Sequence, residues 1–140
     1  MRKVVSVILA VLCLAGALCS CSKKVPETVE TRSRTAIRTI YGTPGQNHHF
    51  YWDVVKEDGT IDGYEIWTME KTFGGALEKM KVAEFNSNEK GKLKDMQIAN
   101  YDLPEGTEWA FYINGDFSKE NPDTLETVNG FVYSLVQVKK

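Results

Sequence analysis

Residues 49–70 decide the fold of this chain, and they read HFYWDVVKEDGTIDGYEIWTME. Apolar and polar side chains alternate through the first half, so that Phe50, Trp52 and Val54 share one side. A period of two is typical of a β-strand with one buried face. The Asp-Gly pair at residues 58–59 is a strong turn signal, because glycine tolerates positive φ angles. The stretch therefore predicts a β-hairpin with an aromatic core face.

The rest of the chain repeats this pattern of short alternating segments between turn residues. Residues 73–85 are ambiguous: we interpret them as a loop leading into a strand, with a short helix as the alternative, because Gly74-Gly75 is a poor helix start. The spacing predicts an all-β fold, a seven-stranded antiparallel β-sandwich. Its expected strands are residues 36–41, 49–56, 64–70, 79–85, 93–99, 107–114 and 130–138.

Alternation also predicts which side chains of each strand point into the core. In the last strand it favours Val132, Val136 and Val138 inward, and Phe131 and Tyr133 outward. A register shifted by one residue is the alternative there. The other inward sets are Phe50, Trp52 and Val54; Tyr64, Ile66 and Thr68; and Trp109, Phe111 and Ile113.

Composition limits the class of protein. The chain has 140 residues, of which 42% are hydrophobic and 26% charged, and its net charge is −2. This length suits one domain, and the balanced charge argues against nucleic-acid binding. All three cysteines precede residue 22, so the body can hold no disulfide and no thiol nucleophile.

The N-terminal segment has the pattern of a signal peptide. Arg2 and Lys3 precede an uncharged run that ends near Leu18, and this run is shorter than the roughly 20 residues that a transmembrane helix needs. The next residues, Leu18-Cys19-Ser20-Cys21, resemble the lipobox of bacterial lipoproteins. The resemblance implies a signal peptide over residues 1–20 and a lipidated Cys21. An ordinary secretory signal or a retained membrane anchor is the alternative.

Lipidation would fix the location of the protein. A lipobox cysteine receives a diacylglyceryl group and an N-acyl chain, and more than one chain is needed for stable anchoring. Ser22, and not an aspartate, follows the cysteine; the resemblance to lipoproteins of Gram-negative bacteria then implies transport to the outer membrane. The lack of an acidic run after the cysteine favours the periplasmic side. We expect residues 21–34 to form a flexible tether, with an added edge strand as the alternative. Without Arg2 and Lys3, 15 basic residues face 19 acidic ones, a net charge of −4.

Three segments together resemble a fibronectin type III domain over residues 35–140. They are Phe50-Tyr51-Trp52-Asp53, the segment from Asp62 to Trp67, and the corner from Leu103 to Trp109. The family is a binding and spacing module, so the resemblance implies no catalytic residue and no cofactor. Fold alone does not determine function.

Most candidate chemical sites are weak. His48 and His49 are adjacent, so in a strand they would point to opposite faces and could not easily hold one metal ion; we interpret them as solvated residues at a loop end. Residues 58–63 imitate a calcium loop, but Met69 stands where an EF-hand needs glutamate. The many carboxylates suggest solubility, since a glycosidase needs two in a cleft. We therefore expect no metal site and no enzyme activity.

The strongest positive feature is an expected outward aromatic face. A dense set of exposed aromatic side chains indicates a docking surface, although residues 73–85 or a tail could cover it. The favoured function is a lipid-anchored module that binds an envelope protein. The alternatives are a carbohydrate-binding lipoprotein using Trp67 and Tyr112, and an inhibitor or immunity lipoprotein acting through loops 57–63 and 115–127. The candidate partner-binding residues are Trp67, Met69, Tyr112, Phe131 and Tyr133.

Overall fold

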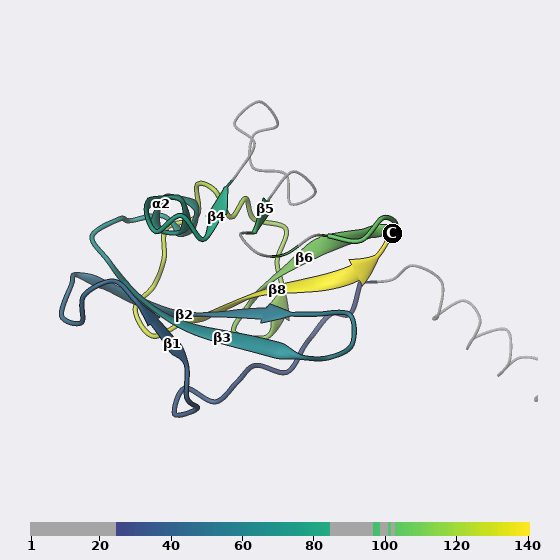
Figure 1. Cartoon of the computed structure of the whole chain (residues 1–140), viewed down its shortest axis with the longest axis horizontal. Helices are drawn as coiled ribbons and strands as arrows, with labels where there is room; N and C mark the ends of the chain where they lie inside the picture. Colours follow the sequence, from purple (N-terminus) through teal and green to yellow (C-terminus); the bar gives the residue numbers. More distant parts are fainter. Residues whose placement is uncertain (1–24, 85–96, 99–100, 102) are drawn as a thin grey trace, which may run out of the picture.

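The computed structural model describes residues 25–84, 97–98, 101 and 103–140 (Figure 1). The expected signal peptide and Cys21 lie outside these residues, as does most of the expected strand 93–99. Within the described part, no helix has the length and hydrophobicity needed to span a membrane.

Six strands form one mixed sheet in the order β1-β3-β2-β8-β6-β7 (Figure 1). The pairs β2–β3, β6–β8 and β6–β7 are antiparallel, whereas β1–β3 and β2–β8 are parallel. The chain is thus mostly β, as predicted. The parallel pairs differ from the expected antiparallel sandwich, which the structure does not confirm. The strands are β1 (Thr39–Tyr41), β2 (His48–Val55), β3 (Ile61–Thr68), β6 (Thr107–Ile113), β7 (Asp116–Phe117) and β8 (Val132–Lys139).

The predicted hairpin is confirmed in strands β2 and β3. Gly59 has a φ of +88°, and the carboxylate of Asp58 accepts a hydrogen bond of 2.9 Å from the Thr60 amide. The turn places Phe50 opposite Ile66 and His49 opposite Trp67. Because paired residues share a face, this register separates an inner face from an outer one.

A second layer covers the inner face of the sheet (Figure 1). It consists of helix α2 (Phe73–Lys79) and the two-stranded pair of β4 (Ala83–Glu84) and β5 (Gln97–Ile98). The helix corresponds to the alternative for residues 73–85. Thr72 caps it by accepting a 3.0 Å hydrogen bond from the Gly75 amide. Gly74 lets the helix approach Asp123, since a Cβ there would lie 2.5 Å from a carboxylate oxygen.

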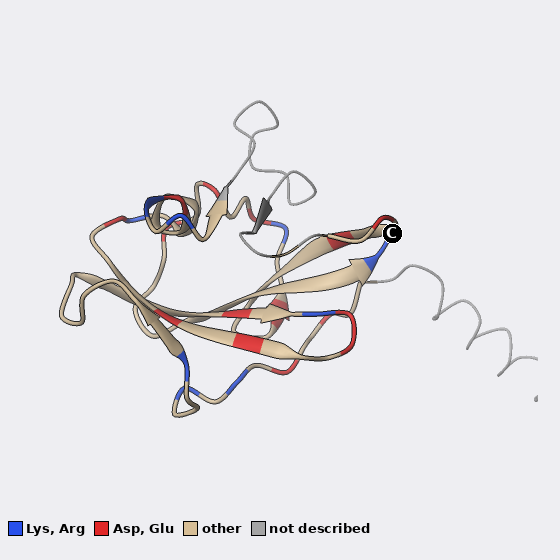
Figure 2. Cartoon of the chain, in the orientation of Figure 1, with Lys and Arg blue, Asp and Glu red and all other residues tan. Residues whose placement is uncertain are grey.

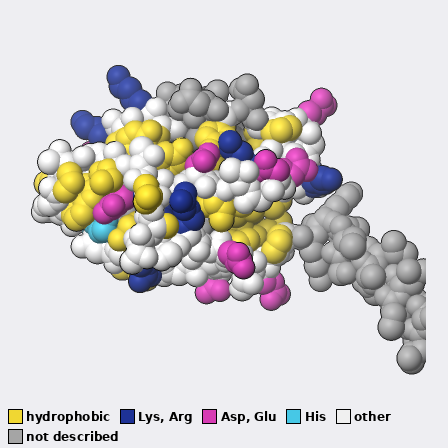
Figure 3. Space-filling model, turned by 60° about the horizontal axis from the view of Figure 1, so that its bottom comes forward, with side chains coloured by type: hydrophobic (Ala, Val, Ile, Leu, Met, Phe, Trp, Pro, Cys, Tyr) yellow, Lys and Arg dark blue, Asp and Glu magenta, His cyan; other side chains and the backbone are white. Residues whose placement is uncertain are grey.

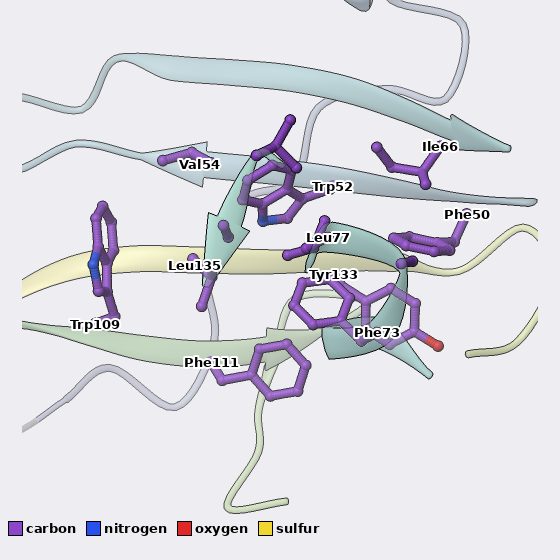
Figure 4. Packing of buried hydrophobic residues seen from close by; sticks show 13 residues of the cluster. Phe50, Trp52, Val54, Ile66, Phe73, Leu77, Trp109, Phe111, Tyr133 and Leu135 are labelled. Atoms are coloured by element: carbon purple, nitrogen blue, oxygen red, sulfur yellow. The ribbon is translucent and has the colours of Figure 1, made fainter. Parts of the chain in front are cut away.

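The main core lies between the sheet and this second layer (Figure 4). The predicted inward sides of β2 and β6 are confirmed by burial of Phe50, Trp52 and Phe111. From the helix, Phe73 lies 5.7 Å from Phe50 and 5.4 Å from Phe111, measured between ring centroids. These aromatic contacts hold the helix to the sheet without a disulfide.

The predicted inward face of β8 is wrong by one residue. Tyr133 and Leu135 point into the main core, whereas Val136 belongs to a smaller cluster on the outer face. The reason is that β8 is buried on both sides, so its apolar residues no longer alternate with polar ones.

Residues 25–34 lie against the sheet and do not form a free tether. The amide of Val29 donates to the Gly115 carbonyl, and the amide of Phe117 donates to the Glu27 carbonyl, each at 2.8 Å. The alternative of an added edge strand is thus the better description near β7. Val25 and Val29 pack on a buried outer-face cluster, and this apolar contact offsets the cost of ordering the segment. We call residues 25–34 the strap.

Candidate binding surface

Four side chains from β2 and β3 gather on the outer face of the sheet. His49 is paired with Trp67, and Tyr51 with Glu65. We call these four residues the distal patch. Strand β2 starts at the end of the sheet far from the C-terminus, whereas the first described residues lie beside the C-terminus (Figure 1). The patch therefore lies at the opposite end of the sheet from the point where the chain enters the domain.

The rings of the patch are held in a fixed arrangement. His49 stacks on Trp67 with ring centroids 3.9 Å apart and planes 17° apart. Tyr51 meets the edge of His49 at 5.0 Å. Glu65 Oε1 lies 2.8 Å from His49 Nε2 and accepts a hydrogen bond of 3.2 Å from Trp67 Nε1. Because one carboxylate connects two rings, the surface needs little ordering when a partner binds.

The patch is half-buried, so a partner could reach it. The side chains of His49 and Glu65 are 20% and 25% exposed. Met69, which directly follows β3, is 58% exposed. Histidine, carboxylate and hydrophobic side chains lie together at this end of the molecule in Figure 3. Such a mixed aromatic and polar composition is typical of protein-binding surfaces.

A buried ion pair links the patch to the strap. Arg38 Nη1 lies 2.7 Å from Asp53 Oδ1, and the two side chains are 1% and 0% exposed. The other oxygen of Asp53 accepts the Arg32 amide at 2.9 Å. The Arg38 guanidinium also lies 4.9 Å from the centre of the Tyr51 ring. Arg38 thus connects the strap, the sheet and the distal patch.

Two of the predicted partner-binding residues are buried, which corrects the expectation that they face outward. Tyr112 is 0% exposed, because the strap covers it and its hydroxyl donates a 2.6 Å hydrogen bond to the Pro26 carbonyl. Tyr133 is 1% exposed, because the β8 register turns it into the main core. Its hydroxyl oxygen accepts the Val128 amide at 2.9 Å.

The other three predicted residues keep some exposure but do not form one cluster. Trp67 lies in the distal patch. Met69 stands two residues further along the chain, directly after the end of β3. Phe131 is half-buried and packs against the main core. The structure therefore retains Trp67 and Met69 as surface candidates near one another.

Sequence reasoning missed the partners of Trp67. His49 lies within β2 and stacks on an indole, so it is not a solvated loop-end residue. The signal that could have found it was the hairpin turn at residues 58–59, which fixes the pairing of the two strands. Counting back from that turn places His49 opposite Trp67 and Tyr51 opposite Glu65.

The described residues hold no group of three or more potential ligands that could bind a metal ion. The loop that imitates a calcium site is the β2–β3 turn. There, hydrogen bonds from the backbone and side chain of Thr60 lower the pKa of Asp58 below its ordinary value. The carboxylate of Asp58 thus serves the turn, where it receives the Thr60 amide.

Comparison with known proteins gives a relationship at the level of fold. No protein-family model matches the sequence, and no curated protein matches it. The crystal structure of a "putative metal binding protein" from Ruminococcus gnavus ATCC 29149 is similar, with a TM-score of 0.56 and 15% sequence identity. The similarity covers 67% of this chain and 99% of that one. At this identity, the chain is similar to that protein in fold alone.

Proposed function

We propose that this protein is a non-enzymatic, lipid-anchored binding module of the bacterial envelope, which binds a partner protein through the distal patch. Cys21 carries the lipid in this proposal, and the outer membrane, facing the periplasm, is the location. The resemblance to a lipobox around Cys21 supports the anchor. The proposal does not depend on the resemblance to fibronectin type III domains.

One observation carries the binding proposal. The distal patch and the entry point of the chain lie at opposite ends of the sheet (Figure 1). A lipid on Cys21, four residues before Val25, would place the entry end next to the bilayer. The rings of His49 and Trp67 would then point into the compartment, where a protein can reach them.

The anchor is tested by labelling cells with a radioactive fatty acid. We expect the label in the wild-type protein and none in Cys21→Ser, which should also leave the membrane fraction. Cys19→Ser serves as the matched control, and we expect it to remain labelled. Unlabelled wild-type protein, or membrane retention of Cys21→Ser, would contradict the anchor.

The patch is tested by in-cell photo-crosslinking. A photo-reactive amino acid at position 67 should give one discrete adduct with a partner protein, because Trp67 lies in the patch. The same amino acid at position 117, where Phe117 is 39% exposed at the other edge of the sheet, should give none. Equal adducts from both positions would contradict the patch.

The same experiment separates the alternatives. The carbohydrate hypothesis needs Trp67 and Tyr112 together on the surface, and burial of Tyr112 removes that pair. Binding to a glycan array that is lost in Trp67→Ala would instead indicate a sugar site that uses Trp67 without Tyr112. The inhibitor hypothesis uses loops 57–63 and 115–127, so it predicts adducts from Asp58 and none from position 67.

A further inference from the structure

The two edges of the sheet end differently. At the β7 edge, the strap adds main-chain hydrogen bonds from Val29 to Gly115 and from Phe117 to Glu27. At the other edge, β1 pairs with β3 on one side, and among the described residues no strand pairs with its other side. An open edge presents unpaired N–H and C=O groups, which can pair with another extended chain.

Exposed apolar side chains accompany this open edge. Ile40 lies in β1 and is 54% exposed. Ile37, two residues before the start of β1, is 91% exposed. Ile40 is paired with Glu65, so it lies on the same face as the distal patch. The edge thus adjoins the patch at Glu65.

A cavity of about 200 Å³ opens beside the start of β1. Its volume is large enough for one side chain of a bound segment. It is lined by Arg32 and by residues 37–39 and 62–64.

The segment that leads into β1 is positively charged. Residues 32–38 read RSRTAIR and contain three arginines and no carboxylate. Asp53 neutralises Arg38, whereas Arg34 is exposed. Figure 2 shows the positions of basic residues in blue along the ribbon that leads into β1. A partner segment with an acidic residue at this end would complement Arg34.

We infer that the open edge of β1 binds an extended segment of a partner protein, which adds a strand to the sheet. The segment alternates apolar and polar residues, places apolar side chains on Ile37 and Ile40, and carries an acidic residue near Arg34. This inference rests on the proposed function, because it specifies how the partner of the distal patch is held. Main-chain pairing supplies affinity in this mode, and the alternate side chains supply specificity.

A second copy of the chain fits the edge less well. It could offer only β1 itself, which has three residues. This short strand lies between two turns. The Ala36 amide donates to the Ser33 carbonyl in the turn before it, and the Gln46 amide donates to the Thr43 carbonyl in the turn after it. A second copy would also bring its own basic segment, residues 32–38, where a carboxylate is needed to complement Arg34.

The inference is tested with a phage-displayed library of random dodecapeptides, selected on the full lipidated protein in detergent. We expect enriched peptides with apolar residues at alternate positions and at least one acidic residue. Ile40→Lys should weaken the selected peptides by about tenfold or more, because an exposed lysine discourages pairing at an edge. The matched control Phe117→Lys, at the opposite edge, should change the affinity by less than about twofold.

Hydrogen exchange of the wild-type protein provides a second readout that needs no variant. Bound peptide should slow exchange of the amides in Thr39–Tyr41 and leave the β7 edge unchanged. No enriched peptide, or peptides indifferent to Ile40→Lys, would overturn the inference. Sedimentation that shows a dimer lost on Ile40→Lys would also overturn it, in favour of a second copy. Peptides sensitive to Trp67→Ala but not to Ile40→Lys would leave the proposed function standing and refute the edge.

Discussion

Arg38 and Asp53 join three parts of the chain through one buried ion pair. The carboxylate of Asp53 receives both the Arg38 guanidinium and the Arg32 amide. In return, Arg38 Nη2 donates to the Arg32 carbonyl at 2.9 Å. Each charge therefore has several partners, which is the condition under which a buried pair is tolerated.

We predict that Asp53→Asn lowers the free energy of unfolding by about 3–5 kcal/mol, because it leaves the Arg38 charge buried without a counter-ion. Urea denaturation measures the loss. The control is Glu57→Gln, whose contact with Lys139 is 3.7 Å long and exposed; it should change stability by about 1 kcal/mol or less. A similar loss in both variants would contradict the role of the pair.

Tyr112 predicts a dependence of stability on alkaline pH. Burial raises the pKa of Tyr112 above its ordinary value near 10, and also those of Tyr64 and Tyr133. The neutral phenol is thus favoured in the fold, so its contribution is complete below pH 10 and is lost as the pH rises above it. Tyr112→Phe removes the hydrogen bond of the hydroxyl, so it should lower the free energy of unfolding by about 1 kcal/mol at neutral pH. Above pH 10, the stability of this variant should fall less steeply with pH than that of the wild-type protein. An unchanged alkaline slope in urea titrations would refute this assignment.

The strap lies against the sheet, where a flexible tether was expected from the sequence. It covers Tyr112 and completes the β7 edge. We predict slow hydrogen exchange at the amides of Val29 and Phe117, since both are bonded to carbonyls. Asp53→Ala should speed exchange at Val29, because it releases Arg32 from the sheet. Fast exchange at Val29 in the wild-type protein would mean that the strap is free.

Helix α2 depends on close packing at Gly74. We predict that Gly74→Ala destabilises the protein by about 1–3 kcal/mol, as overpacking does, although alanine favours an isolated helix by about 1 kcal/mol. Thermal unfolding measures this effect. Lys79→Ala on the exposed side of the same helix should stay within about 0.5 kcal/mol. A stabilised Gly74→Ala would show that Asp123 can move away.

Strands β2, β3 and β6 could be predicted from the sequence because the more apolar side chains of each strand stand at alternate positions, such as Phe50 and Trp52 in β2 or Trp109 and Phe111 in β6. Strand β8 could not be oriented, since both of its faces are buried. The helix carried a weak signal, because it is one short element that begins with glycines, and the contacts of Phe73 with the sheet stabilise it. For the distal patch, the sequence predicted Trp67, while its pairing with His49 depends on strand register.

At the scale of the whole molecule, one mixed sheet is covered on both faces. The helical layer lies on one face and the strap lies on the other. The uncovered surfaces are the distal patch and, among the described residues, the outer edge of β1. The two surfaces adjoin through Ile40 and Glu65, so one partner could contact both.

Capture of Val25 by the sheet has a geometric consequence for a lipidated protein. Four peptide units separate Cys21 from Val25, and a fully stretched chain covers roughly 3.5 Å per unit, or roughly 14 Å in total. The folded domain would then lie close to the lipid headgroups, and its rotation would be restricted. The end of the sheet that holds His49 and Trp67 would then keep a nearly constant orientation, turned away from the lipid, so a molecule that diffuses in the compartment would meet it without having to contact the bilayer.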